Sequence, residues 1–103
     1  MSIVVTATFV PHPGKREELL AALEEVIPLV HAEEGCELYS IQEREDGLIL
    51  MIEKWESAEL LDAHGEGAPV VAFRGRLEGL LAEPVVVTRY EPIPVGDPGK
   101  GAL

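Results

Sequence analysis

Cysteine is almost absent from this chain of 103 residues, because Cys36 is the only one. A single cysteine cannot form an internal disulfide or a cysteine-based metal site. The histidines are scattered, and the sequence contains no His-x-His, His-x-x-x-His or Cys-x-x-Cys spacing. We therefore expect no metal and no cofactor, and the cysteine content is typical of a reducing cytoplasm.

Basic side chains are also scarce, since 8 Lys and Arg oppose 19 Asp and Glu for a formal net charge of −11. Such a surface repels phosphate backbones and anionic lipids, so nucleic acid and membranes are poor partners for it. The longest apolar runs, such as residues 48–52, are too short to span a bilayer. No signal peptide is visible before Ile3, and a cytoplasmic location is expected.

Two common signatures of catalysis are missing as well. The glycines form no G-x-x-x-x-G-K-[ST] pattern for phosphate binding, and no serine or cysteine lies in a nucleophile motif. What remains is a globular composition with 47% hydrophobic and 26% charged residues. The length suits one domain.

Hydrophobic periodicity divides the chain into short elements. It predicts strands over residues 2–10, 36–44, 48–56 and 84–91, and helices over 15–34, 58–64 and 69–83. Asp46-Gly47 predicts a hairpin between the two middle strands, and Pro28 should bend the first helix. The Pro- and Gly-rich tail over residues 93–103 has little reason to fold alone, so the domain is expected to end at residue 92.

The order β-α-β-β-α-β predicts an α+β fold of ferredoxin-like type, an antiparallel sheet with helices on one face. Both faces of the strands are apolar, however, since Ile49 and Met51 point one way and Leu50 and Ile52 the other. An uncovered face would cost on the order of 10 kcal/mol, against a total stability of about 5–15 kcal/mol for a small domain. We therefore expect a homodimer formed by sheet-to-sheet packing.

Glu53 is the one carboxylate inside the apolar third strand. A carboxylate on a buried face must be paired, hydrogen-bonded or protonated. Glu53 could form a structural ion pair with Arg89, Arg74 or Arg76, or it could line a pocket. The sequence leaves both interpretations open.

Three further side chains are candidates for a site. Trp55, the only tryptophan, either packs in the core with its indole N–H on an acceptor or forms the wall of a pocket for a flat aromatic ligand. Tyr39 presents the same choice. His64 is either the C-terminal cap of the short helix or a general base that titrates near neutrality. His12 and His31 have weaker claims.

Four segments in a fixed order point to a known family. They are Pro13-Gly14-Lys15, Glu34-Gly35-Cys36-Glu37-Leu38-Tyr39, Glu53-Lys54-Trp55-Glu56-Ser57 and Asp62-Ala63-His64. Together they resemble the antibiotic biosynthesis monooxygenase family, in particular its small quinol monooxygenase-like members. The resemblance covers residues 3–92 and implies a dimeric α+β barrel with one pocket per subunit between sheet and helices.

The resemblance also implies an activity. Oxygenases of this family oxidise quinols or phenols with O2 and without metal or flavin. By this resemblance, His64 would be the catalytic base. Glu53, Trp55 and Tyr39 would bind the small aromatic substrate. The haem-degrading branch has an asparagine in the first strand and a histidine on the second long helix. Because Thr6-Ala7-Thr8 and Ala72-Phe73-Arg74 stand there, haem degradation is not expected.

Two other functions stay open at this point. One is a non-enzymatic, small-ligand-binding or stress-related dimer whose pocket residues are structural. The other is an isomerase or lyase that acts on a polar metabolite, which would need cationic groups such as Arg74, Arg76 and Arg89.

Overall fold

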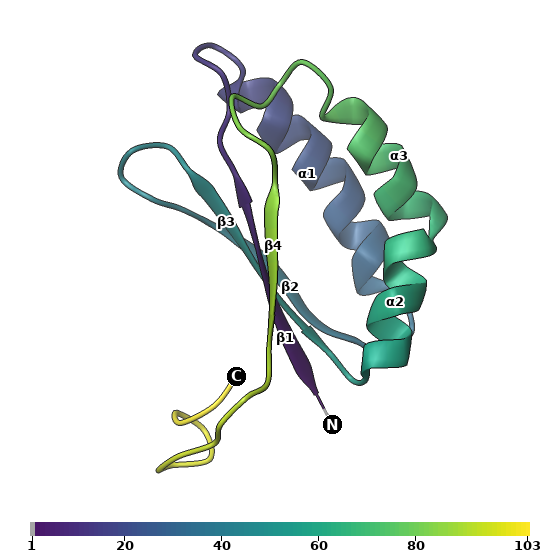
Figure 1. Ribbon diagram of the computed structural model, residues 1–103, viewed down its shortest axis with the longest axis vertical. Coiled ribbons are helices and arrows are strands. Elements are labelled where there is room, and N and C mark those ends of the chain that lie inside the picture. The colour runs from purple at the N-terminus through teal and green to yellow at the C-terminus, as the bar shows by residue number, and fades with distance from the viewer. Residues whose placement is uncertain (1) are drawn as a thin grey trace.

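The chain folds as strands and helices in the order β-α-β-β-α-α-β in a computed structural model that describes residues 2–103 (Figure 1). The strands are β1 (Ile3–Phe9), β2 (Cys36–Glu43), β3 (Ile49–Trp55) and β4 (Val86–Tyr90), and the helices are α1 (Arg16–His31), α2 (Ala58–Glu66) and α3 (Ala68–Arg76). The sheet order is β2-β3-β1-β4, with every neighbouring pair antiparallel. The predicted ferredoxin-like α+β fold is confirmed.

The largest departure from the predicted elements follows α3. The helix predicted to continue toward residue 83 ends at Arg76, and turns follow. Within these turns Gly79 adopts a left-handed φ of +77°, which glycine reaches at little steric cost. The His12 N–H then donates to the Leu80 carbonyl oxygen at 2.8 Å and ties these turns to the end of β1.

One row of paired residues crosses the sheet and positions the site. Tyr39 pairs with Glu53, Glu53 pairs with Val5, and Val5 pairs with Arg89. Directly paired residues point to the same face of a sheet. All four side chains therefore face the helices.

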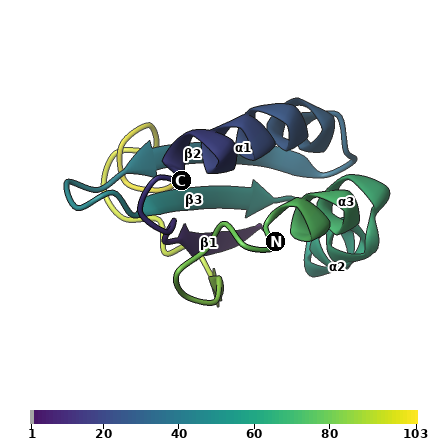
Figure 2. The same cartoon turned by 90° about the horizontal axis from the view of Figure 1, so that it is seen from above.

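The core lies between the helices and this face of the sheet. Its largest fully buried side chains are Trp55, Leu19, Leu23, Ile49 and Met51. Helix α1 lies nearest to β2, whereas α2 and α3 lie toward the β1 side (Figure 2). All residues of β4 are exposed, so the space between this edge strand and the two short helices is not filled by core side chains.

The opposite face of the sheet carries no helix among the described elements. Val86 and Tyr90 are 59% and 48% exposed there, and Leu50 and Ile52 are half-buried. Thr6 pairs with Ile52 and with Thr88, so the hydroxyl groups of both threonines lie on the same face. These hydroxyl groups interrupt the apolar surface of this face, and the homodimer stays a prediction.

The tail was predicted to have little reason to fold alone, yet it forms a local turn beyond β4 (Figure 1). The Gly101 N–H donates to the Asp97 carbonyl oxygen at 2.7 Å, and the Val95 N–H donates to the Gly101 carbonyl oxygen at 3.2 Å. Ile93 is 80% exposed. Among residues 2–103, no helix has the length and apolar character needed to cross a membrane.

Candidate active site

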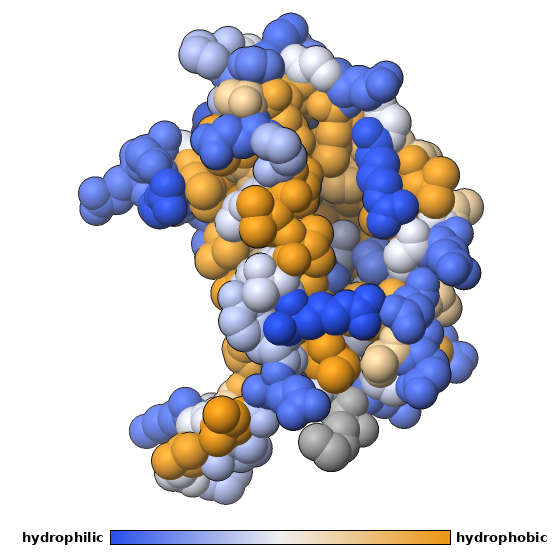
Figure 3. All heavy atoms as spheres, in the orientation of Figure 1, coloured by the Kyte–Doolittle hydropathy of each residue, from blue (hydrophilic) through white to orange (hydrophobic). Residues whose placement is uncertain are grey.

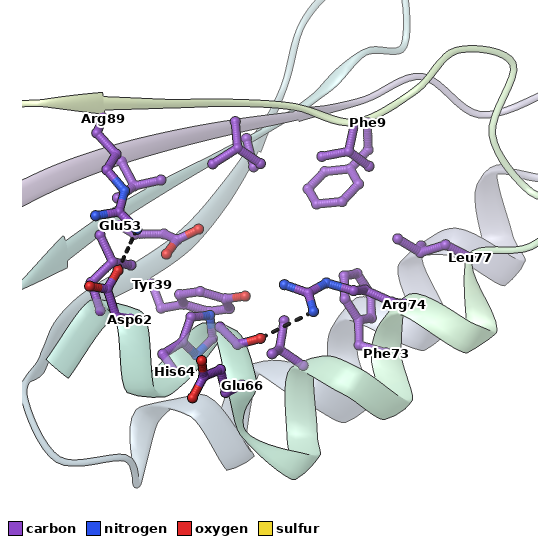
Figure 4. Close-up of a pocket in the computed structure, with 17 residues that line it drawn as sticks. Phe9, Tyr39, Glu53, Asp62, His64, Glu66, Phe73, Arg74, Leu77 and Arg89 are labelled. Atoms are coloured by element: carbon purple, nitrogen blue, oxygen red, sulfur yellow. Dashed lines mark hydrogen bonds and ion pairs between the residues drawn. The ribbon is translucent and has the colours of Figure 1, made fainter. Parts of the chain in front are cut away.

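A cavity of about 600 Å³ opens between β1 and β4 on one side and α2 and α3 on the other (Figure 3). Most of its walls are apolar, formed by Val5, Ala7, Phe9, Leu61, Val70, Phe73, Leu77, Val85 and Val87. The polar lining groups gather toward α2 and are Tyr39, Glu53, Asp62, His64, Glu66, Arg74 and Arg89 (Figure 4). A ligand with an apolar body and a polar end would suit this shape.

Helix α2 delivers His64 to the cavity. The Ser57 hydroxyl oxygen accepts the Leu60 N–H at 3.2 Å, which fixes the start of the helix as the sequence predicted. Leu61 and His64 are the buried residues of α2 and lie one turn apart on the same side. His64 is only 6% exposed, so its imidazole is part of the cavity wall.

A carboxylate outside the cavity lining fixes the orientation of this imidazole. His64 Nδ1 lies 3.0 Å from Oε1 of Glu33, a residue in the turn after α1. Because a carboxylate can only accept, the proton of the neutral ring is on Nδ1 and the lone pair is on Nε2. Nε2 has no hydrogen-bond partner among the described residues and is not sealed from solvent. His64 lines the cavity, and Nε2 is the ring nitrogen that Glu33 leaves free.

Glu53 lies on the sheet side of the cavity with its carboxyl group directed inward (Figure 4). The Trp55 indole Nε1–H donates to Glu53 Oε1 at 2.9 Å. Burial raises the pKa of Glu53 above its ordinary value, and the Trp55 hydrogen bond and the nearby His64 oppose that rise more weakly. Glu53 is therefore easier to protonate than an exposed glutamate.

The alternative prediction of an arginine partner for Glu53 is wrong. Arg89 pairs with Asp62 at 2.7 Å, and Arg76 pairs with Glu25. Arg74 donates from Nη1 to the Gly65 carbonyl oxygen at 3.1 Å. The hydrogen bond from Trp55, rather than an ion pair, satisfies this buried carboxyl group.

Tyr39 completes the polar end. It is 4% exposed, and its ring lies edge-on to His64 with centroids 5.5 Å apart. Burial raises the pKa of Tyr39 far above its ordinary range, so the hydroxyl stays protonated at neutral pH. The phenol can therefore donate a hydrogen bond into the cavity (Figure 4).

Comparison with known proteins agrees with this architecture. Residues 2–76 match the family model described as antibiotic biosynthesis monooxygenase. The protein named "Putative monooxygenase Rv0793" from Mycobacterium tuberculosis is 34% identical over 92 residues, which cover 88% of this chain and 91% of that relative. The chain belongs to the antibiotic biosynthesis monooxygenase family.

Other family relatives support the assignment. The protein named "Probable quinol monooxygenase YgiN" from Escherichia coli (strain K12) is 30% identical over 93 residues, covering 79% of this chain and 89% of that relative. The solved structure of Rv0793 superposes with a TM-score of 0.87 at 32% identity, covering 94% of this chain and 100% of the other. The family predicted from the ordered segments is confirmed.

Trp55 occupies a different place in this family member than the pocket-wall interpretation predicted. It is fully buried and does not line the cavity. Its ring lies behind the imidazole of His64, with centroids 4.5 Å apart and planes tilted by 31°. Trp55 thus supports Glu53 by a hydrogen bond and His64 by packing, whereas His64, Glu53 and Tyr39 meet in the cavity.

Three other residues singled out in the sequence lie outside the cavity lining. His31 Nε2 is hydrogen-bonded to the Tyr39 carbonyl oxygen at 2.9 Å, and His12 is exposed in a turn. Burial raises the pKa of the Cys36 thiol, which keeps it in its less reactive form. Within residues 2–103, no three His, Cys, Asp or Glu side chains are grouped so that they could hold a metal ion.

Sequence reasoning missed Glu33. The residue is one of several glutamates near the end of α1, and its contact with His64 joins positions 31 apart in the chain. No local spacing signals such a pair. The clue is structural: Glu33 is largely buried, and its Oε2 has no hydrogen-bond partner among the described residues.

Proposed function

We propose that the protein is a monooxygenase that oxidises a small quinol or phenol with O2, without a metal or a flavin. The observation that carries the proposal is the imidazole of His64, which lines a mostly apolar cavity while Glu33 holds Nδ1 and leaves Nε2 free. The family membership and the names of the relatives support oxidation as the chemistry.

The proposed first step is removal of a phenolic proton by His64 Nε2. The proton moves from the substrate oxygen to the ring, and the carboxylate of Glu33 stabilises the imidazolium that forms. The phenolate is much richer in electrons than the phenol and transfers an electron to O2. The protein contributes position, deprotonation and exclusion of water.

The electrons balance with O2 as the only co-substrate. One oxygen atom is inserted into a ring C–H bond, and the other leaves as water. The quinol supplies all the electrons and leaves as a hydroxyquinone. Tyr39 and Glu53 would hold the second oxygen of the quinol, since each presents a hydrogen-bonding group on the same wall.

Oxygen uptake tests this proposal directly. Wild type and His64→Ala are compared with hydroquinone and menadiol after subtraction of spontaneous oxidation. A positioned general base contributes roughly 10²–10⁴-fold, so the variant should lose about that factor in rate. His12→Ala is the control, because His12 is exposed and lies outside the cavity lining. Equal rates in wild type and His64→Ala would exclude His64 as the base.

The predominantly apolar wall favours one alternative, a binding protein without turnover. Such a protein would be stabilised by aromatic ligands, because binding to the native state raises apparent stability. It would consume no oxygen with any quinol. A thermal shift without oxygen uptake would therefore favour this alternative.

A further inference from the structure

Arg74 differs from the other arginines of the chain. The others pair with carboxylates, as Arg16 with Glu43 at 2.8 Å, Arg44 with Asp46 at 2.6 Å, Arg89 with Asp62 at 2.7 Å, and Arg76 with Glu25. Within residues 2–103, no carboxylate lies within ion-pairing distance of Arg74. In a chain with 19 acidic and 8 basic residues, an arginine without a carboxylate is unexpected.

The guanidinium of Arg74 points into the cavity. Arg74 lies in the last turn of α3, and Figure 4 shows its side chain extending toward the hydroxyl of Tyr39. Its charge is near enough to act against the rise in the pKa of Tyr39 that burial causes. One Nη1–H donates to the Gly65 carbonyl oxygen at 3.1 Å, which anchors the group over the cavity. A guanidinium has five N–H donors, so several stay available to a ligand.

We propose that Arg74 binds a carboxylate carried by the aromatic ligand, so that the substrate class is a quinol or phenol carboxylate. The proposal rests on the proposed function, which gives the substrate its aromatic ring, and adds that the substrate also carries a negatively charged carboxylate. With the phenolic oxygen at His64 and the ring against the apolar wall, a ring substituent can extend toward α3. The planar fork of arginine matches the two oxygens of a carboxylate.

The acidic groups that line the cavity do not pair with the guanidinium of Arg74, so its positive charge stays available to a ligand. Asp62 is paired with Arg89, and Glu53 accepts the hydrogen bond from Trp55. Glu66 is exposed, and within residues 2–103 no ion pair joins its carboxylate to Arg74. Arg74 is thus the lining cation that is not already engaged with a carboxylate in the described part of the chain.

A purely structural role for Arg74 gives a different expectation. The bond to the Gly65 carbonyl also caps the end of α2. If that were its only role, replacing Arg74 would affect neutral and anionic ligands alike. A ligand-binding role affects the anionic ligand selectively.

Calorimetric titration under anaerobic conditions tests the proposal with gentisate, a hydroquinone carboxylate, and gentisamide, its neutral analogue. The wild type should bind gentisate about tenfold more tightly than gentisamide, and Arg74→Gln should abolish that preference. The control is Arg76→Gln. Arg76 lies on the same helix, but it pairs with Glu25 and does not line the cavity. Arg76→Gln should retain the preference.

Several results would overturn the proposal. Equal binding of gentisate and gentisamide by the wild type would do so without any variant, as would a preference that survives Arg74→Gln. If hydroquinone monophosphate binds more tightly than gentisate, and this binding depends on Arg74, the site prefers a phosphate to a carboxylate and the proposal is overturned. Because no O2 is present, these results are independent of turnover: a protein that prefers gentisate but consumes no oxygen would refute only the proposed function.

Discussion

Glu33, in the turn after α1, holds Nδ1 of His64, near the end of α2, at 3.0 Å. In the sequence, Glu33 precedes the β2–β3 hairpin and His64 follows it. The contact leaves Nε2, the other nitrogen of this cavity-lining ring, free. The chemistry we propose therefore depends on a residue that does not line the cavity.

Replacing Glu33 by glutamine should impair the reaction through the orientation of His64. An amide can either accept from or donate to Nδ1, so the imidazole no longer has one enforced tautomer. We expect oxygen uptake to fall about tenfold or more, less than on removal of the base itself. Nitrogen NMR of the imidazole should show loss of the single Nδ1–H tautomer.

The neighbouring carboxylate supplies the control for that experiment. Glu34 is exposed in the same turn, so Glu34→Gln makes the same charge change without touching His64. Its rate and tautomer should match those of the wild type. If both variants behave alike, Glu33 does not position His64.

Glu53 should make folding stability depend on pH in a specific direction. Burial raises the pKa of Glu53 in the folded state above the ordinary value of 4.5. The stability linked to this raised pKa is present below the unfolded value and is lost as pH rises through the folded value. Glu53→Gln keeps an acceptor for Trp55 but cannot ionise. The free energy of unfolding of Glu53→Gln should therefore increase relative to that of the wild type as pH rises.

Urea unfolding of both proteins between acid and neutral pH measures this difference. Other titrating groups are shared, so their contributions cancel in the comparison. A difference that stays constant across the range would mean that Glu53 ionises as readily in the fold as outside it.

Gly35 should be intolerant of a side chain because of its contact with α2. Its φ is +84°, and an added Cβ would lie 2.5 Å from Leu60 Cδ1 and 2.8 Å from Leu60 Cβ. Left-handed geometry costs alanine about 1–2 kcal/mol, and overpacking costs about 1–3 kcal/mol more. Gly35→Ala should therefore lower the free energy of unfolding by the sum of both effects and displace the helix that carries His64.

Gly14 separates the two effects, because its φ is +82° and an added Cβ would meet nothing within 4 Å. Gly14→Ala should show the cost of left-handed geometry alone in urea unfolding. Equal losses in the two variants would show that the contact with Leu60 contributes nothing.

The homodimer predicted from the sequence is tested by a charge on the open face of the sheet. Val86 is 59% exposed on β4, and Val71 is 52% exposed on α3. If two sheets pack together, the wild type should sediment as a dimer and Val86→Asp should dissociate it, while Val71→Asp should leave it intact. A wild type that sediments as a monomer at micromolar concentration would contradict the prediction.

Local patterns predicted most of the fold because each element repeats its apolar residues at its own period. The alternation of Ile49, Met51 and Trp55 identified β3 and placed Glu53 on the buried face, where the structure has it. The end of α3 was harder to predict, since the apolar pattern continues through Leu77 while the backbone turns.

The polar contacts of the site could not be predicted in the same way. The sequence drew attention to Glu53, His64 and Tyr39, because polar groups within apolar elements are conspicuous, and the structure brings all three to one cavity. Their partners depend on how separate elements pack, which no spacing encodes. Glu53 is thus bound by Trp55 on its own strand, while Glu33 reaches His64 from a distant turn.

The most direct test of the account is the fate of isotopically labelled O2 during oxidation of hydroquinone. We expect the wild type to place one labelled oxygen atom in the hydroxyquinone and the other in water, with His64→Ala producing almost none of this product. An unlabelled product, or equal label incorporation by both proteins, would contradict a monooxygenase that uses His64 as its base.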